Sequence, residues 1–178
     1  MKIYDCFTYF DEDLILDTRL NILNDYVDYF VIVESTFNHN GESRQLKFDI
    51  NKFEKFKKKI KYVVWDKIPE DIEKINENDE EIIRERKFIN NAVRRDNGQR
   101  NYVMKGLENA DKNDLILLSD LDEIPLLNKI DLKKIKHKII IFEQLMCYYK
   151  FNLAIPNYKW FGTRACLKKN LKSPQWLR

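Results

Sequence analysis

Apolar positions follow two different spacings along the chain. Residues 29–33 form a short apolar run of strand length, and residues 114–119 contain a second at 115–118; both runs are rich in β-branched or aliphatic side chains. Such runs are typical of strands buried on both faces of a sheet. Between residues 16 and 27, apolar side chains instead recur every three or four positions, which predicts an amphipathic helix. The chain therefore mixes buried strands with helices.

The rest of the pattern extends this alternation. We expect further strands at residues 2–10, 60–65 and 138–142 and a shorter one at 148–151, a short helix at 51–59, an acidic loop at 70–81, and two helices within 82–110 that are broken near Asn97-Gly98. Strands that alternate with helices predict an α/β fold with a mostly parallel, mixed central sheet between two helical layers. No linker or repeat divides the chain, so we expect one domain over residues 1–178.

Composition excludes several classes of protein. Of 178 residues, 44% are hydrophobic and 34% charged, which is typical of a folded domain. The four glycines are too few and too scattered for a dinucleotide fingerprint or a phosphate-binding P-loop. His39 and His137 are the only histidines, which excludes a His-rich metal site, and three isolated cysteines indicate no disulfide framework.

Charge and hydropathy indicate a protein that does not bind nucleic acid and has no transmembrane segment. The net charge is only +3, and the lysine runs at residues 55–61 and 133–138 are interleaved with apolar residues. We interpret these runs as solvated helix faces rather than as a nucleic-acid groove. No apolar run approaches the length of a membrane span, and none resembles a signal peptide. We therefore expect a cytoplasmic protein.

The strongest chemical signal is a group of acidic residues that directly follows the strand at 114–119. Asp120, Asp122 and Glu123 occupy four positions at the end of a strand, where α/β sheets bind ligands. Three neighbouring carboxylates repel one another unless a cation neutralises them, and oxygen ligands suit Mg²⁺ or Mn²⁺. The alternative is a capped turn before Pro125, and the spacing alone does not decide between the two.

Two further residues are candidates on positional grounds. Glu34 ends the strand at 29–33 and should reach the same edge of the sheet. Arg100 lies on the helix that precedes the acidic strand, where its planar guanidinium could orient an acid or bind a phosphate. The alternative for Arg100 is an exposed position on a helix surface.

The acidic segment and its surroundings resemble glycosyltransferase family 17. The resemblance rests on Gln99-Arg100-Asn101 followed by Asp114 to Pro125, on Phe10 to Leu14 with Arg19-Leu20, on Asp28 to Ser35, and on Tyr148 to Asn152 with Trp160 to Thr163. These segments occur in the family's order along nearly the whole chain. The family includes the β-1,4-mannosyl-glycoprotein N-acetylglucosaminyltransferases.

This resemblance implies a GT-A fold and metal-dependent transfer of a sugar, with UDP-GlcNAc as the expected donor and a glycan as the acceptor. Asp122 would bind Mn²⁺ or Mg²⁺ directly, and Asp120 would contact the metal through water or bind the ribose. The nucleoside would lie near Glu34, with Asp11 and Arg19 as neighbours. The metal would neutralise the departing nucleoside diphosphate.

The sequence departs from the family in its length and in its histidines. Family members generally extend beyond a position such as Arg178, and many GT-A enzymes use a late histidine as a further metal ligand, whereas no histidine follows His137. We therefore expect a short C-terminal region and a bacterial or viral glycan as acceptor. Glu123 and Glu143 are the two candidates for the general base.

Two other functions compete with this interpretation. A phosphatase of the haloacid dehalogenase type also places a DxD motif after a strand, but its motif usually lies near the start of the chain, and 119 residues precede Asp120 here. The second is a relative that binds sugar nucleotides or glycans without turnover, with Trp160, Trp176, Tyr148 and Tyr149 as an apolar platform.

Overall fold

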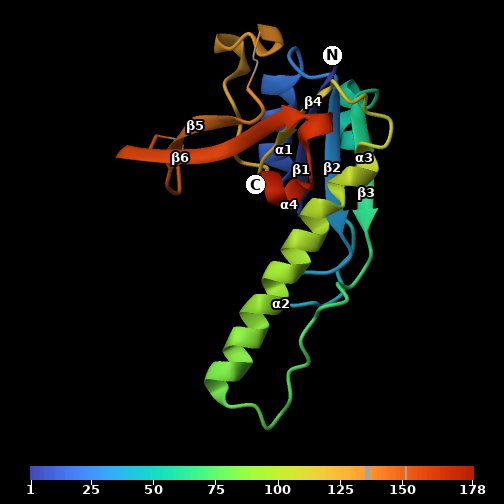
Figure 1. Cartoon of the computed structure of the whole chain (residues 1–178), viewed down its shortest axis with the longest axis vertical. Helices are drawn as coiled ribbons and strands as arrows, with labels where there is room; N and C mark the ends of the chain where they lie inside the picture. Colours follow the sequence, from blue (N-terminus) through green and yellow to red (C-terminus); the bar gives the residue numbers. More distant parts are fainter. Residues whose placement is uncertain (135–136, 151) are drawn as a thin grey trace.

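The computed structural model describes residues 1–134, 137–150 and 152–178, and it is built around one mixed sheet of six strands (Figure 1). The strands lie in the order β3-β2-β1-β4-β6-β5. Their bounds are β1 Ile3–Tyr9, β2 Tyr29–Ser35, β3 Ile60–Trp65, β4 Leu115–Leu118, β5 Ile140–Cys147 and β6 Ala154–Leu167. The predicted α/β class with a mostly parallel sheet is confirmed.

Strands β1 to β4 run parallel, and β6 and β5 complete the sheet as an antiparallel pair. Both apolar runs lie inside the sheet as predicted, because β2 is bordered by β3 and β1, and β4 by β1 and β6. The carboxyl ends of β1, β2 and β4 therefore meet at one edge. This is the edge at which open α/β sheets bind ligands.

Helices cover both faces of the sheet. The α-helices are α1 Asp13–Leu23, α2 Glu81–Asn101, α3 Val103–Gly106 and α4 Pro174–Leu177, and the 3-10 helices are η1 Ile50–Phe56, η2 Leu127–Lys129, η3 Leu132–Lys134 and η4 Lys168–Asn170. Leu16 and Leu20 of α1 pack with Phe7 on one face. Val103 of α3 and Leu177 of α4 pack on the other face. The fold thus has three layers.

Helix α2 differs from the prediction, because it continues through Asn97-Gly98 without a break. Gly98 faces Trp65 so closely that a Cβ would lie 2.7 Å from its Cζ2 atom. The glycine is therefore explained by tight helix–sheet packing rather than by a helix end. Most of α2 extends away from the sheet, with residues 66–80 running beside it as an irregular segment (Figure 1).

Three smaller predictions also differ from the structure. The helix expected at 51–59 is the 3-10 helix η1, and the strand expected at 138–142 begins later, as β5, and runs to Cys147. The strand expected at 148–151 is wrong over residues 148–150, which form a bend with Tyr149 at a positive φ of 64°. Residue 151 lies outside the described residues, as do residues 135–136 within the predicted lysine-rich helix face.

Candidate functional site

A cavity of about 550 Å³ opens at the carboxyl ends of β1 and β4. Its lining comes from the β1–α1 connection, the loop after β2, helix α2, the acidic loop after β4 and the segment after β5. The lining residues are Thr8, Tyr9, Phe10, Glu12, Ile15, His39, Asp96, Gln99, Asp120, Leu121, Asp122, Cys147, Tyr149 and Lys150. The acidic loop after β4 therefore faces a cavity that a ligand can enter.

Asp122 is the carboxylate of the acidic loop that is available to a ligand. Its side chain is exposed and makes no hydrogen bond or ion pair with any residue that the structure describes. A turn-capping carboxylate would accept backbone N–H groups, and neither Asp120 nor Asp122 does so through its side chain. Glu123 caps the turn instead, because its Oε2 accepts a hydrogen bond from the Asp120 N–H at 2.9 Å. The loop is therefore closed without using Asp122.

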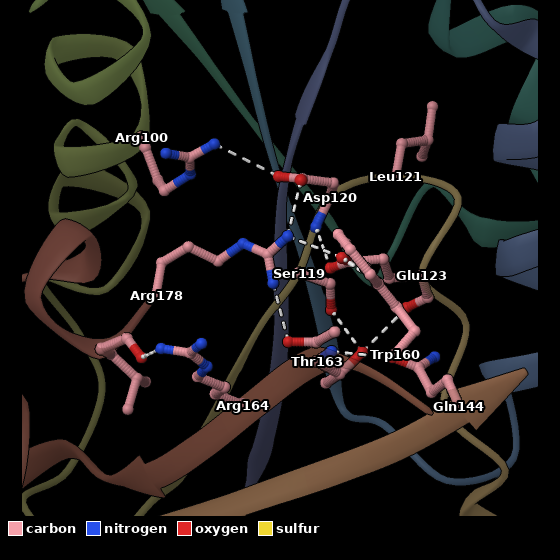
Figure 2. Close-up of polar contacts among 12 residues, drawn as sticks. Arg100, Ser119, Asp120, Leu121, Glu123, Gln144, Trp160, Thr163, Arg164 and Arg178 are labelled. Carbon is pink, nitrogen blue, oxygen red and sulfur yellow. Dashed lines mark hydrogen bonds and ion pairs between the residues drawn. The ribbon is translucent and has the colours of Figure 1, made fainter. Parts of the chain in front are cut away.

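Asp120 also lines the cavity, but two arginines hold its carboxylate (Figure 2). Arg100 of α2 donates to Oδ1 at 3.3 Å, and Arg178 donates to Oδ2 at 2.7 Å. Arg100 also pairs with Asp96, one helical turn earlier. Burial lowers the pKa of Arg178, but Asp120 and Glu123 more than offset this and leave that pKa raised. Asp120 is therefore a fixed, neutralised carboxylate.

Glu123 lies behind the loop rather than in the cavity. It is almost fully buried, and its Oε1 accepts hydrogen bonds from Trp160 Nε1 at 2.7 Å and from Arg178 at 2.6 Å (Figure 2). With Oε2 bound to the Asp120 N–H, both carboxylate oxygens are occupied. These contacts favour a role in shaping the loop over the predicted role as general base.

Arg19 is placed differently from the expectation that it adjoins the nucleoside. Its side chain has no exposed surface and pairs with buried Asp5 at 2.7 Å. Its Nη1 donates to the carbonyls of Asp120, Leu121 and Glu123, and its Nη2 to Ser119 Oγ. The guanidinium therefore holds the backbone of the acidic loop from beneath, and it cannot touch a ligand in this conformation.

Glu34 is likewise buried and structural in its contacts. It pairs with Arg44 at 3.0 Å and accepts hydrogen bonds from the backbone N–H groups of Lys47 and Phe48 and from the Tyr62 hydroxyl. The carboxylate raises the pKa of Tyr62, after burial as the larger cause. Glu34 thus fixes the segment after β2 to the sheet and does not line the cavity.

The structure does not bring the last two predicted residues into the cavity. Asp11 is exposed between Phe10 and Glu12, which do line it. Glu143 lies on β5, more than half exposed, and pairs with Lys159 at 3.0 Å. The roles assigned to Asp11 and Glu143 stay predictions that this geometry does not favour.

Sequence reasoning missed Arg178 as part of the site, and it named Trp160 only as a possible sugar platform, not as a hydrogen-bond donor to Glu123. Arg178 is 58 positions from Asp120, and no periodicity connects them. A charge argument could have found it, because three adjacent carboxylates need more than the one cation that Arg100 supplies. Gln99 was also overlooked as a residue of the cavity, where its amide donates to the Val33 carbonyl at 3.0 Å.

The residues present fit a divalent cation only if a ligand shares it. Within the described part of the chain, no group of three or more His, Cys, Asp or Glu side chains is arranged to hold a metal alone. Mg²⁺ and Mn²⁺ are commonly bound by one or two carboxylates together with the phosphates of a substrate. Asp122, with Asp120 beside it, matches that smaller donor set.

The cavity lies at the carboxyl ends of parallel strands, where open α/β sheets bind ligands, and the family comparison gives the class of enzyme. The model of glycosyltransferase family 17 matches residues 1–174, so the chain belongs to that family and is a glycosyltransferase. Its donor is therefore a nucleotide sugar and its acceptor a glycan. A search of curated proteins returns no match. No helix in the described ranges is both long and apolar enough to cross a membrane.

Proposed function

We propose that this glycosyltransferase binds a UDP-sugar, with UDP-GlcNAc as the first candidate, in the cavity at the ends of β1 and β4, and that binding requires Mn²⁺ or Mg²⁺. The observation that carries the proposal is the carboxylate of Asp122, which faces that cavity beside the neutralised Asp120 and has no partner among the described residues.

Electrostatics support the need for a cation. A carboxylate and a phosphate charge 4 Å apart repel by about 4 kcal/mol at an effective dielectric constant of about 20. Arg100 and Arg178 already compensate Asp120 and Glu123, so they leave the charge of Asp122 uncompensated. Asp122 could hold a divalent cation, which would supply the positive charge that offsets this repulsion.

Asp122, Asp120 and Arg19 would have different roles at this site. Asp122 would hold the metal directly, and Asp120, clamped by two arginines, would orient the loop and contact the metal through water or bind the ribose. The bound metal supplies charge neutralisation of the departing diphosphate. Arg19 keeps the loop backbone in place through three carbonyls, so the position of Asp122 does not depend on the ligand. The UDP part of the proposal rests on the family resemblance.

The test is release of UDP from UDP-GlcNAc with a panel of glycan acceptors, with Mn²⁺ and with EDTA. We expect release only with the metal, and a loss of about two orders of magnitude or more in Asp122→Asn, the scale of losing one main electrostatic stabiliser. Asp17→Asn is the matched control, because Asp17 is exposed on α1 and outside the cavity. Equal release in EDTA and in Mn²⁺ would refute the metal requirement.

A further inference from the structure

A second cavity, of about 430 Å³, lies beside β6 next to the acidic loop. It is lined by Tyr158, Lys159, Trp160, Phe161, Arg164 and Arg178. Arg178 also donates to Asp120, which lines the first cavity, and Arg178 and Trp160 both donate to Glu123 (Figure 2). The two cavities are therefore neighbours joined through one set of hydrogen bonds.

The three cations that line this second cavity differ in how far nearby carboxylates neutralise them. Arg178 is paired with Asp120 and Glu123, and Lys159 is paired with Glu143 in an exposed ion pair that water weakens. Arg164 has no carboxylate partner within the described residues, because its Nη1 donates only to a backbone carbonyl, that of Leu177, at 3.2 Å. Its buried Nε has no hydrogen-bond partner in the same part of the chain. Arg164 thus brings an uncompensated positive charge to the cavity.

The remaining lining suits a sugar ring. The rings of Tyr158 and Phe161 are about half exposed beside these cations, and an aromatic face packs well against the apolar face of a saccharide. Strand β4 pairs only with residues 164–167 of β6, whereas β5 covers the opposite edge, and the Gly162 carbonyl of β6 accepts from Arg178. One edge of β6 before residue 164 therefore has no strand partner among the described residues.

We propose that this second cavity is the acceptor subsite and that it selects an acidic saccharide, with Arg164 and Lys159 binding its carboxylate or other anionic group. The assignment rests on the proposed function, because transfer requires an acceptor held next to the donor. The second cavity lies beside the first, because Arg178 of its lining donates to Asp120 of the other.

The test compares trigalacturonate with its methyl ester, which has the same sugar units but carries neutral methyl esters in place of the carboxylates. Calorimetry is done on the full chain with UDP and Mn²⁺ present, and a parallel titration measures UDP binding in Mn²⁺ alone. We expect the acid to bind about tenfold more tightly than the ester, the scale of one charge-assisted hydrogen bond. Arg164→Gln should remove most of that difference and leave binding of the ester and of UDP unchanged.

Two further variants distinguish binding at this cavity from nonspecific attraction of the acid to the positively charged protein. Lys159→Gln, at a mostly exposed side chain, should also weaken binding of the acid, and it remains informative if Arg164→Gln does not fold. Arg86→Gln, on the exposed surface of α2, is the control and should have no effect. Equal binding of acid and ester, or equal weakening by Arg86→Gln, would overturn the subsite. Failure of UDP to bind in Mn²⁺ would instead contradict the proposed donor site.

Discussion

Arg178 and Asp120 form an ion pair at 2.7 Å, although they are 58 positions apart in the chain. The same guanidinium donates to Glu123 at 2.6 Å and to the Gly162 carbonyl at 2.7 Å. One side chain therefore ties the acidic loop to β6. Because Arg100 holds the other oxygen of Asp120, Asp122 is the acidic side chain of the loop that has no partner among the residues described by the structure.

We predict that Arg178→Gln destabilises the fold by about 1–3 kcal/mol, because buried Glu123 loses its cationic partner and Asp120 loses one of two. Arg178→Lys should recover only part of this, because an ammonium lacks the planar fork. Urea unfolding monitored by tryptophan fluorescence measures the free energy of unfolding of both variants. Wild-type stability in Arg178→Gln would show that the ion pairs contribute nothing.

Arg19 should be far more sensitive to substitution. Arg19→Met leaves the charge of Asp5 buried without a partner and frees the carbonyls of the acidic loop, so we expect a loss of about 3–5 kcal/mol. Asp5→Asn and the double variant complete a mutant cycle. We expect the double variant to lose less than the sum of the two single losses. Additive losses would mean that the pair is not coupled.

The sequence predicted the sheet well because its strands are buried on both faces. Continuous apolar runs such as residues 29–33 can be satisfied only inside a covered sheet, and both predicted interior strands are found there. The acidic loop was found for a related reason, since carboxylates that follow such a strand must emerge at its carboxyl end.

Other features depend on partners that are distant in sequence. Arg19 and Glu34 are charged, which suggests exposed positions, yet each is fully buried because an opposite charge meets it from another element. The unbroken course of α2 was missed because a glycine within a helical pattern resembles a helix end. Only the proximity of Trp65 explains Gly98.

Gly98→Ala tests this explanation. Alanine stabilises a solvent-exposed helix position by about 1 kcal/mol relative to glycine. Here its Cβ would meet Trp65 at 2.7 Å, so we expect a net loss of about 1–3 kcal/mol from overpacking. Thermal unfolding followed by circular dichroism provides the measurement. A stabilised variant would indicate that Trp65 moves freely and that the glycine is not required by packing.

The two buried thiols should be unreactive in the folded protein. Burial raises the pKa of Cys166 from 9.0 to about 11 and raises that of Cys6 as well. At pH 8 only about one Cys166 thiol in a thousand is then ionised, and the thiolate is the reactive form. We expect iodoacetamide to label Cys6 and Cys166 only after unfolding in urea, as read by peptide mass spectrometry. Rapid labelling of the native protein would contradict their burial.

The same shift has a consequence for stability. A thiol with a raised pKa in the folded state favours folding below the unfolded value, and this contribution is lost as pH rises from about 9 to about 11. Cys166→Ala removes the titrating group, so its stability should decline less over this range than that of the wild type.

The proposed donor site requires Asp122 to share a divalent cation with the donor diphosphate. Calorimetric titration of UDP into the wild type, in Mn²⁺ and in EDTA, with Asp122→Asn and the control Asp17→Asn, measures this. We predict binding of UDP to the wild type and to Asp17→Asn only in Mn²⁺, and loss of that binding in Asp122→Asn with an unchanged melting temperature. Equal UDP affinity in EDTA and Mn²⁺, or unaltered binding by Asp122→Asn, would contradict the central claim.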